Sequence, residues 1–253
     1  ANPQIPAPIT ITCIVASFHV PSDLEHWAMS DQNEYADLEW RDGKIPVATR
    51  FDDPYFSLDN GIAETEHVFL VGNDFPERFQ VGFHIAELGF GSGLNLLCAW
   101  KAWRDAGQTT PLRFTSFEAF PMAPVDMEQA HKAWPELVDY AAAFAAIWDA
   151  EAGRATCDTL DATVIYGDAR QALAAWDDAA DAWFLDGFSP AKNPELWGAD
   201  LMDQVAQHTA TGGTFATYTA AGHVRQSLGA AGFAVERITG FGRKRHMSRG
   251  VLV

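Results

Sequence analysis

The sequence is short of cysteine, of long apolar runs and of basic residues. Its three cysteines among 253 residues lie far apart, at Cys13, Cys98 and Cys157, which excludes a disulfide framework and a short-spaced zinc site and indicates a reducing compartment. No apolar run approaches the roughly 18 to 20 residues of a membrane span. The apolar stretch Ile9–Phe18 has no basic residue before it, unlike a secretory signal. We therefore expect a cytoplasmic protein without membrane insertion.

Basic residues are outnumbered, because 17 Lys and Arg stand against 34 Asp and Glu, a formal net charge of −17. A nucleic-acid partner normally goes with a basic balance, so this charge alone favours a small-molecule or protein partner. However, residues 223–253 hold six basic residues and one acid, a local balance of +5 that leaves −22 for the rest. Arg243, Lys244 and Arg245 are the densest part of it and form either a solvated turn or a patch that contacts phosphates.

From residue 83 onward, short apolar runs alternate with amphipathic segments, which indicates strand–helix units that build a parallel sheet. The seven expected strands are Phe83–Leu88, Arg113–Phe117, Thr163–Tyr166, Ala182–Leu185, Thr214–Tyr218, Ala234–Thr239 and Gly250–Val253. The expected helices are Gly93–Asp105, Ala123–Trp134, Ala169–Trp176, Pro194–Ala210 and Gly222–Ala231. A short loop over 240–244 joins the last two strands as a hairpin, which places an antiparallel strand in a mostly parallel, three-layer α/β sandwich.

The first third of the chain has a different pattern. Leu38–Arg41 and Ile45–Ala48 flank Asp42 and Gly43, a strong hairpin signal, and residues 64–70 are predicted to be helical. We expect an unassigned extension over residues 1–28, a small cap over 29–82 that packs on the main domain, and the main α/β domain over 83–253.

One strand delivers a carboxylate into a loop. The apolar run 182–185 leads to Asp186, and the following residues hold too much glycine and proline to continue as helix or strand. This is how a parallel sheet presents a reactive group at its carboxyl edge. The same loop carries Phe188 and Lys192, so it suits a flat substrate held beside an acid and a base.

A glycine loop follows the first strand of the main domain. Gly89, Gly91 and Gly93 stand between that strand and an amphipathic helix, an arrangement in which backbone approaches a ligand closely at a helix start. The pattern also occurs in dinucleotide sites and as a plain tight turn. Glu87 before the glycines and Glu118 at the end of the next strand favour S-adenosylmethionine, whose ribose hydroxyls a carboxylate can bind. An NAD enzyme would share Glu118.

Acids recur at the ends of the first four strands. Asp168 follows the third strand, where it either caps the next helix, accepts a hydrogen bond from an adenine amine, or does both. Together with Glu87, Glu118 and Asp186, it gives each of these strands an acid near its carboxyl end. The repetition is a stronger indication of a ligand site than any single motif.

Four segments make the resemblance to a family specific. Residues 186–194 (Asp-Gly-Phe-Ser-Pro-Ala-Lys-Asn-Pro), 51–57, 61–65 and 240–245 resemble the methyltransferase half of MnmC, the tRNA 5-methylaminomethyl-2-thiouridine biosynthesis bifunctional proteins. The similarity runs from about residue 38 to residue 250. The loop at 186–194 is highly specific, whereas the glycine loop alone indicates only a methyltransferase.

The resemblance implies a class I, Rossmann-like methyltransferase fold and transfer of a methyl group from S-adenosylmethionine to the aminomethyl nitrogen of a wobble uridine in tRNA. Asp186 then occupies the active-site loop position. The residues implied at the cofactor are Glu87, Gly89, Gly91, Gly93, Glu118, Asp168, Tyr55, Phe56 and Asn60. The residues implied at the substrate are Phe188, Pro190, Lys192, Asn193, Arg243, Lys244 and Arg245.

Residue chemistry agrees with these roles. Asp186 can accept a hydrogen bond from a neutral amine, orient it and offset the charge that develops on nitrogen, without acting as nucleophile or metal ligand. Phe188 either stacks on an extruded base or packs beneath the loop. Lys192 either contacts phosphate or is a solvated loop cation.

Other functions remain open from sequence alone. They are a methyltransferase for a small-molecule or protein amine, which the acidic charge favours, a scaffold without activity for an oxidase partner, and an NAD-linked dehydrogenase. The eight histidines show no metal-ligand spacing and no Ser, His and Asp series stands out, so we expect no metal and do not favour a hydrolase. The sequence ends without a second glycine-rich dinucleotide motif, so an FAD-dependent oxidase would have to be a partner domain or protein.

Overall fold

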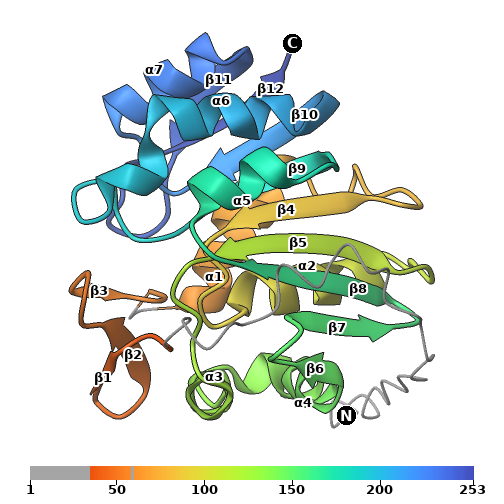
Figure 1. Cartoon of the computed structure of the whole chain (residues 1–253). Coiled ribbons are helices and arrows are strands. Elements are labelled where there is room, and N and C mark those ends of the chain that lie inside the picture. The colour runs from red at the N-terminus through yellow and green to blue at the C-terminus, as the bar shows by residue number, and fades with distance from the viewer. Residues whose placement is uncertain (1–34, 58–59) are drawn as a thin grey trace, which may run out of the picture.

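The computed structural model describes residues 35–57 and 60–253, and the expected extension over 1–28 lies outside them. A nine-stranded sheet forms the centre of the molecule (Figure 1). Its strands are β4 His84–Leu88, β5 Leu112–Glu118, β6 Trp148–Asp149, β7 Arg154–Cys157, β8 Leu160–Tyr166, β9 Ala180–Leu185, β10 Thr209–Thr217, β11 Phe233–Thr239 and β12 His246–Leu252. Their order across the sheet is β11-β12-β10-β9-β4-β5-β8-β7-β6.

Five central strands, β10, β9, β4, β5 and β8, run parallel. All seven expected strands are present, and the last two form the expected antiparallel hairpin, with β12 inserted beside β10. The count of seven is wrong because β6 and β7 extend the sheet at the other edge. These two strands have only two and four residues, which is too short for a clear alternating pattern.

Helices cover both faces of the sheet. They are α2 Leu94–Asp105, α3 Pro124–His131, α4 Val138–Ile147, α5 Ala169–Ala175, α6 Ala199–Gln207 and α7 Gly222–Ala230, with short 3₁₀ turns η4 Pro135–Leu137 and η5 Pro194–Trp197. Two buried clusters result, one beneath α2 and α4 and one beneath α5, α6 and α7, the helices in front of the sheet in Figure 1. The expected helix over 194–210 is divided because Gly198 is extended before α6, and α4 was missed.

The segment before β4 forms a small sheet and a helical stretch. The elements are β1 Leu38–Arg41, β2 Ile45–Ala48, β3 Asp53–Pro54, α1 Gly61–Thr65, the π-helical turn η2 Glu66–Leu70 and the 3₁₀ turn η3 Val71–Asn73. The hairpin at Asp42 is confirmed, and the helix starts earlier than residue 64 because Asn60 caps it. Phe69 packs on Phe184 of β9, with ring centroids 5.2 Å apart. The cap boundary at residue 82 stays a prediction.

Among the described residues, no helix combines the length and the apolar character that a bilayer crossing requires.

A buried histidine joins three strands at the amino edge of the sheet. His84 is 2 % exposed, and its ring nitrogens contact the Ala179 carbonyl at 3.0 Å and the Thr115 hydroxyl at 2.9 Å. Asp178 lies 3.8 Å from the ring and pairs with Arg113. Burial first, and then Arg113, lower the pKa of His84 below its usual range.

We expect this histidine to make stability depend on pH. The folded state favours neutral His84, whereas this residue protonates near pH 6.5 in the unfolded chain. The free energy of unfolding therefore has its full value above that pH and falls as the pH drops toward the lowered pKa of the folded state. Thermal melting of wild type and His84→Gln between pH 7.5 and 4.5 checks this. The variant should show a flatter dependence, and the exposed His223→Gln should follow wild type; identical slopes for all three would contradict the prediction.

Candidate active site

A cavity of about 890 Å³ opens at the carboxyl edge of the sheet. It lies between the ends of the central strands and the segment 50–65, and the loop 241–244 closes part of its rim. Ligand pockets occupy roughly 300 to 1,000 Å³, so this volume suits a large ligand or two ligands together. Glu118, Asp168 and Asp186, which the sequence places at three different strand ends, all line it.

The glycine loop and the Asp186 loop touch each other. Gly89 has φ +87°, and a Cβ there would lie 3.1 Å from the Gly187 Cα and 3.3 Å from its nitrogen. Gly187 also has a positive φ, +115°. The contact arises because β4 and β9 are neighbouring parallel strands that end side by side. Only glycine allows both the backbone conformation and the separation.

Glu118 ties the glycine loop to the end of β5. Its two carboxylate oxygens accept hydrogen bonds from the backbone nitrogens of Gly91 at 2.9 Å and Phe120 at 2.8 Å. Burial raises the pKa of Glu118, and these donors oppose the rise. A carboxylate oxygen can accept more than one hydrogen bond, so the ribose contact stays a prediction that these bonds do not exclude.

The cap segment contributes Tyr55, Phe56 and Asn60 to the same wall. The Tyr55 ring lies against Gly91, where a Cβ would approach its Cδ1 to 2.9 Å. The Tyr55 hydroxyl is buried and finds no hydrogen-bond partner among the described residues, and burial raises its pKa. A buried hydroxyl normally has a partner, so this one fits the presence of a polar ligand in the cavity.

Asp168 caps α5 by accepting a hydrogen bond from the Arg170 backbone nitrogen at 2.9 Å. The Arg170 side chain also binds this carboxylate and lowers the pKa of Asp168. Both residues line the cavity. The capping role is therefore confirmed, and the adenine contact stays a prediction that capping does not exclude.

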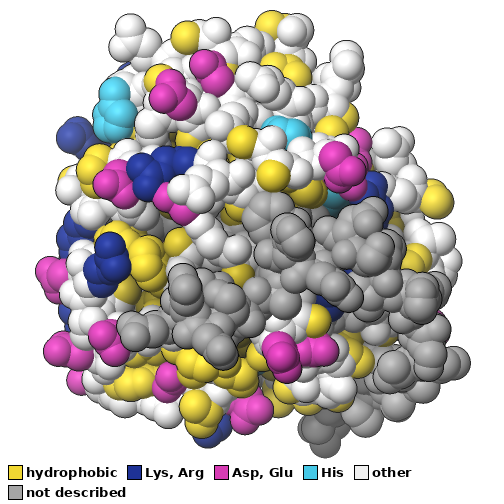
Figure 2. Space-filling view, in the orientation of Figure 1, with side chains coloured by type: hydrophobic (Ala, Val, Ile, Leu, Met, Phe, Trp, Pro, Cys, Tyr) yellow, Lys and Arg dark blue, Asp and Glu magenta, His cyan; other side chains and the backbone are white. Residues whose placement is uncertain are grey.

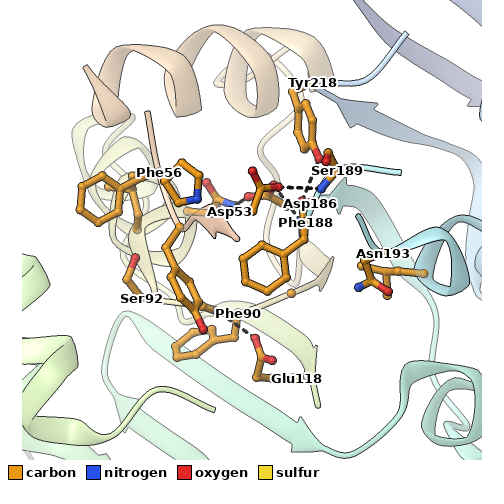
Figure 3. Close-up of a pocket in the computed structure, with 18 of the residues that line it drawn as sticks. Asp53, Phe56, Phe90, Ser92, Glu118, Asp186, Phe188, Ser189, Asn193 and Tyr218 are labelled. Carbon is orange, nitrogen blue, oxygen red and sulfur yellow. Dashed lines mark hydrogen bonds between the residues drawn. The ribbon is translucent and has the colours of Figure 1, made fainter. Parts of the chain in front are cut away.

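Asp186 is held by two donors. Its Oδ1 accepts from the Gly187 backbone nitrogen and its Oδ2 from the Asn95 side chain, both at 2.8 Å. Burial raises the pKa of Asp186 to about 6, while the two donors and Lys244 lower it. Figure 3 shows the carboxylate pointing into the cavity beside Tyr218, whose hydroxyl donates to the Gly187 carbonyl at 2.9 Å.

Phe188 is both packed and accessible to the cavity. Its ring stacks on Phe51 with centroids 4.5 Å apart and an interplanar angle of 24°, and Tyr55 meets it edge-on at 5.2 Å. The ring still forms part of the cavity wall (Figure 3). Packing beneath the loop is thus confirmed, and stacking on an extruded base stays a prediction that this packing does not exclude.

Lys192 binds the cap. Its Nζ contacts the Asp52 carbonyl and lies 3.5 Å from the Asp52 carboxylate and 3.6 Å from that of Asp53. Asp53 also accepts a hydrogen bond from the Ser189 backbone nitrogen at 3.0 Å. Lys192 is therefore neither a free loop cation nor part of the cavity wall, because two cap acids hold it. Asn193 from the same loop lines the cavity, whereas Pro190 does not.

The basic cluster divides into different roles. Lys244 pairs with Glu64 at 2.8 Å and lies 4.2 Å from the Tyr218 ring centroid, inside the cavity rim. Arg243 lines the rim and Arg245 lies outside it, and neither has an ion-pair partner among the described residues.

Two residues that are predicted to contact the cofactor do not line the cavity. Glu87 is fully buried behind the cavity wall, where Asn95 and Ser116 donate to its carboxylate at 2.8 and 2.7 Å. Gly93 precedes α2 with φ +76° and packs near the Phe90 ring, also off the wall. Neighbouring residues of the motif therefore face different directions, and only some of them face the cavity.

Some residues at the site were missed from sequence. Asn95 is polar within the apolar start of α2, which is a readable signal for a buried contact. Arg50 lines the cavity and lies 4.5 Å from the Phe120 ring centroid, with no comparable pattern around it. In the described part of the chain, no three His, Cys, Asp or Glu side chains gather as metal ligands.

Comparison with known proteins agrees with this geometry. A family model for S-adenosyl-L-methionine-dependent methyltransferases matches residues 128–253. The MnmC bifunctional protein of Hahella chejuensis is 44% identical over 231 residues, which is 87% of this chain and 37% of the relative, and that of Ectopseudomonas mendocina is 43% identical over 88% of this chain and 35% of the relative. The chain belongs to the methyltransferase part of the MnmC family.

A solved structure gives the same assignment. MnmC2 from Aquifex aeolicus superposes with a TM-score of 0.66 and 26% identity, covering 91% of this chain and 74% of that one. The fold is thus the Rossmann-like methyltransferase fold expected, and the cofactor is S-adenosylmethionine. The chain spans just over a third of the length of the curated relatives that it matches.

The contact between the two loops predicts an effect of Gly89→Ala. The added methyl group would separate the loops, so we expect binding of S-adenosylhomocysteine to weaken at least tenfold by isothermal titration calorimetry. Gly107→Ala is the matched control, because Gly107 has φ +77° but nothing within 4 Å of its added Cβ. It should cost about 1 kcal/mol of stability and leave binding intact. Equal binding in both variants would contradict the role of the contact.

Proposed function

We propose that this chain transfers a methyl group from S-adenosylmethionine to the aminomethyl nitrogen of 5-aminomethyl-2-thiouridine at the wobble position of tRNA, which gives 5-methylaminomethyl-2-thiouridine. The observation that carries the proposal is the Asp186 carboxylate, which is desolvated at the wall of the same cavity as Glu118 and the glycine loop. The name of the relatives, tRNA 5-methylaminomethyl-2-thiouridine biosynthesis bifunctional protein, supports this substrate.

The chemistry needs a neutral amine in a fixed direction. When bound, S-adenosylmethionine supplies an electrophilic methyl carbon on a sulfonium. Asp186 accepts a hydrogen bond from the amine, points its lone pair toward that carbon, and stabilises the positive charge that grows on nitrogen. With its pKa raised to about 6, Asp186 is ionised at neutral pH and can also receive the proton that the methylated amine loses.

Aromatic residues suit a flat base next to this carboxylate. Phe188 lies two residues after Asp186, and Phe51 supports its ring from behind. Enzymes that modify a base extrude it from the stack and hold it on aromatic faces. We therefore assign the uracil ring to the exposed face of Phe188, with Asn193 near its polar edge.

Basic residues at the rim are proposed to contact tRNA phosphates. Arg243 and Arg245 have no ion-pair partner among the described residues, and Arg50 also lines the cavity. Over the coloured part of Figure 2, Lys and Arg side chains are interspersed with Asp and Glu, without a broad basic surface. Binding then depends on a few local contacts around the cavity mouth.

Two further parts of the proposal concern its setting. An FAD-dependent oxidase, as a domain or separate protein, is a proposed partner, since the relatives are called bifunctional and are much longer than this chain. The cytoplasm is the proposed place of action. The acidic charge of −17 supports a second candidate, methylation of a small-molecule or protein amine.

Methyl transfer to defined tRNA tests the function. With methyl-labelled S-adenosylmethionine, label should enter tRNA that carries 5-aminomethyl-2-thiouridine. Asp186→Ala should lower kcat at least 100-fold, because the amine loses its acceptor, while S-adenosylhomocysteine binding changes less than about threefold. Unmodified tRNA and the free modified nucleoside are the substrate controls. Comparable labelling of unmodified tRNA would refute the wobble-uridine assignment, and preference for the free nucleoside would favour the second candidate.

Salt dependence tests the rim. Each lost phosphate contact should reduce the slope of log affinity against log salt by about 0.7 to 0.9, so the double variant Arg243→Ala, Arg245→Ala should show a shallower slope in tRNA binding. Arg249→Ala is the control, because Glu236 and Asp74 already pair with Arg249. Equal slopes for the double variant and wild type would return the two arginines to a solvated turn.

A further inference from the structure

The side chain of Asn95 lies between two acids. Its Nδ2 donates to Glu87 Oε1 and to Asp186 Oδ2, both at 2.8 Å, and its Oδ1 accepts from the Thr65 hydroxyl at 2.9 Å. Asn95 is 6 % exposed. The amide has one possible orientation, because the reversed group would turn its oxygen toward both carboxylates.

Glu87 supports this amide from behind. It is 0 % exposed, and Ser116 donates to its second oxygen at 2.7 Å. Burial raises the pKa of Glu87 well above its usual range, although Ser116 and Asn95 oppose the rise. A hydroxyl can donate or accept, so the contact with Ser116 also fits a neutral carboxyl. Among the described residues, Asn95 and Ser116 donate to the Glu87 carboxyl group, and Asn95 is the one of these two that lines the cavity.

We infer that Asn95 and Glu87 are positioning residues for methyl transfer: Glu87 fixes the Asn95 amide, and Asn95 fixes the Asp186 carboxylate that accepts the substrate amine. The inference rests on the proposed function. It assigns to the acid before the glycine loop a role toward the substrate side in place of a contact with the cofactor.

Asn95 affects both the orientation of the Asp186 carboxylate and the pKa of Asp186. Asn95 and the Gly187 nitrogen occupy one acceptor position on each oxygen, which prevents rotation and leaves a fixed direction for the amine. The donor also favours the ionised form. The charged or titratable groups that face Asp186 are Lys244 and Glu64 at the rim, Tyr218 after β10 and Glu87 through Asn95. Burial and Glu64 raise the pKa of Asp186, and the hydrogen bond from Asn95 lowers it, so removal of Asn95 raises the pKa.

Carboxyl ¹³C NMR on the substrate-free protein measures the first step. In Asn95→Leu, the titration midpoint of Asp186 should move up by roughly one pH unit, because a hydrogen bond to the ionised form is lost. The acid limb of the kcat profile should move with it. At pH 7, kcat on the modified tRNA should fall about 10- to 100-fold with KM changed less than about threefold.

Glu87 variants measure the second step. Glu87→Leu removes the acceptor of Asn95 and should lower kcat about tenfold, whereas Glu87→Gln should restore it to within about threefold, since an amide oxygen still accepts from Asn95 and its nitrogen donates to Ser116. Binding of S-adenosylhomocysteine should stay within about twofold of wild type in both. Melting curves establish that each variant is folded.

The outcomes separate the inference from the proposed function. Inactive wild type on modified tRNA means that the proposed function fails, while the Asp186 titration still reports the contact with Asn95. Active wild type with an unmoved Asp186 titration in Asn95→Leu overturns the inference. Loss of cofactor binding in Glu87→Gln also overturns it, because the charge of Glu87 would then act on the cofactor. If the leucine variants do not fold, Asn95→Asp replaces them: the added acid should raise the Asp186 midpoint, and no change overturns the inference.

Discussion

Two backbone loops that meet at glycines determine the geometry of the site. Neighbouring strands of a sheet lie about 4.8 Å apart, so β4 and β9 deliver their following residues to adjacent positions at the carboxyl edge. Gly89 and Gly187 are where these paths touch, and a side chain at Gly89 would separate them. Because Asp186 directly precedes one glycine of this contact, the carboxylate and the glycine loop keep a fixed relation. The remaining walls are arranged around this pair.

Desolvation governs the acids that surround this contact. Glu87 and Glu118 are buried and Asp186 is partly buried, which raises the pKa of each, and hydrogen-bond donors oppose the rise in each case. The balance differs by position. Glu87 is fully buried, so burial favours its neutral form, whereas Asp186 at the cavity wall also has Lys244 nearby, which favours the ionised form.

The sequence is sufficient to predict those parts of the fold and site that a local pattern of residues determines. The central strands are apolar runs, as buried parallel strands are, and the acids that follow them meet at one edge, so Glu118, Asp168 and Asp186 were found together at the cavity. A local pattern is insufficient to predict the position of a side chain that a tertiary contact determines. Lys192 forms ion pairs with Asp52 and Asp53, which lie 140 and 139 residues away in the sequence. No local sequence pattern predicts a contact over that distance.

The sequence also does not show in which direction each side chain of a motif points. Glu87 stands beside the glycine loop in sequence, yet the alternation of side chains along β4 turns it toward Asn95 and Ser116, away from the cavity. Likewise β6 and β7 follow α4 as short edge strands whose pairing depends on β8 already being in place. Such features become visible only when the register of the sheet is known.

An acidic protein can act on a polyanion when its acids lie inside the active-site cavity and its basic residues lie at the cavity mouth. The proposed reaction involves two positive centres, the sulfonium of the cofactor and the nitrogen that becomes an ammonium, and both favour carboxylates inside the cavity. The phosphates of the proposed tRNA substrate would remain outside, where Arg243 and Arg50 line the cavity and Arg245 follows in the same loop. At physiological ionic strength the screening length is about 8 Å, so acids on distant faces contribute little at that rim. The net charge of −17 therefore governs long-range repulsion, while the local field at the cavity mouth would decide whether the proposed tRNA substrate can dock.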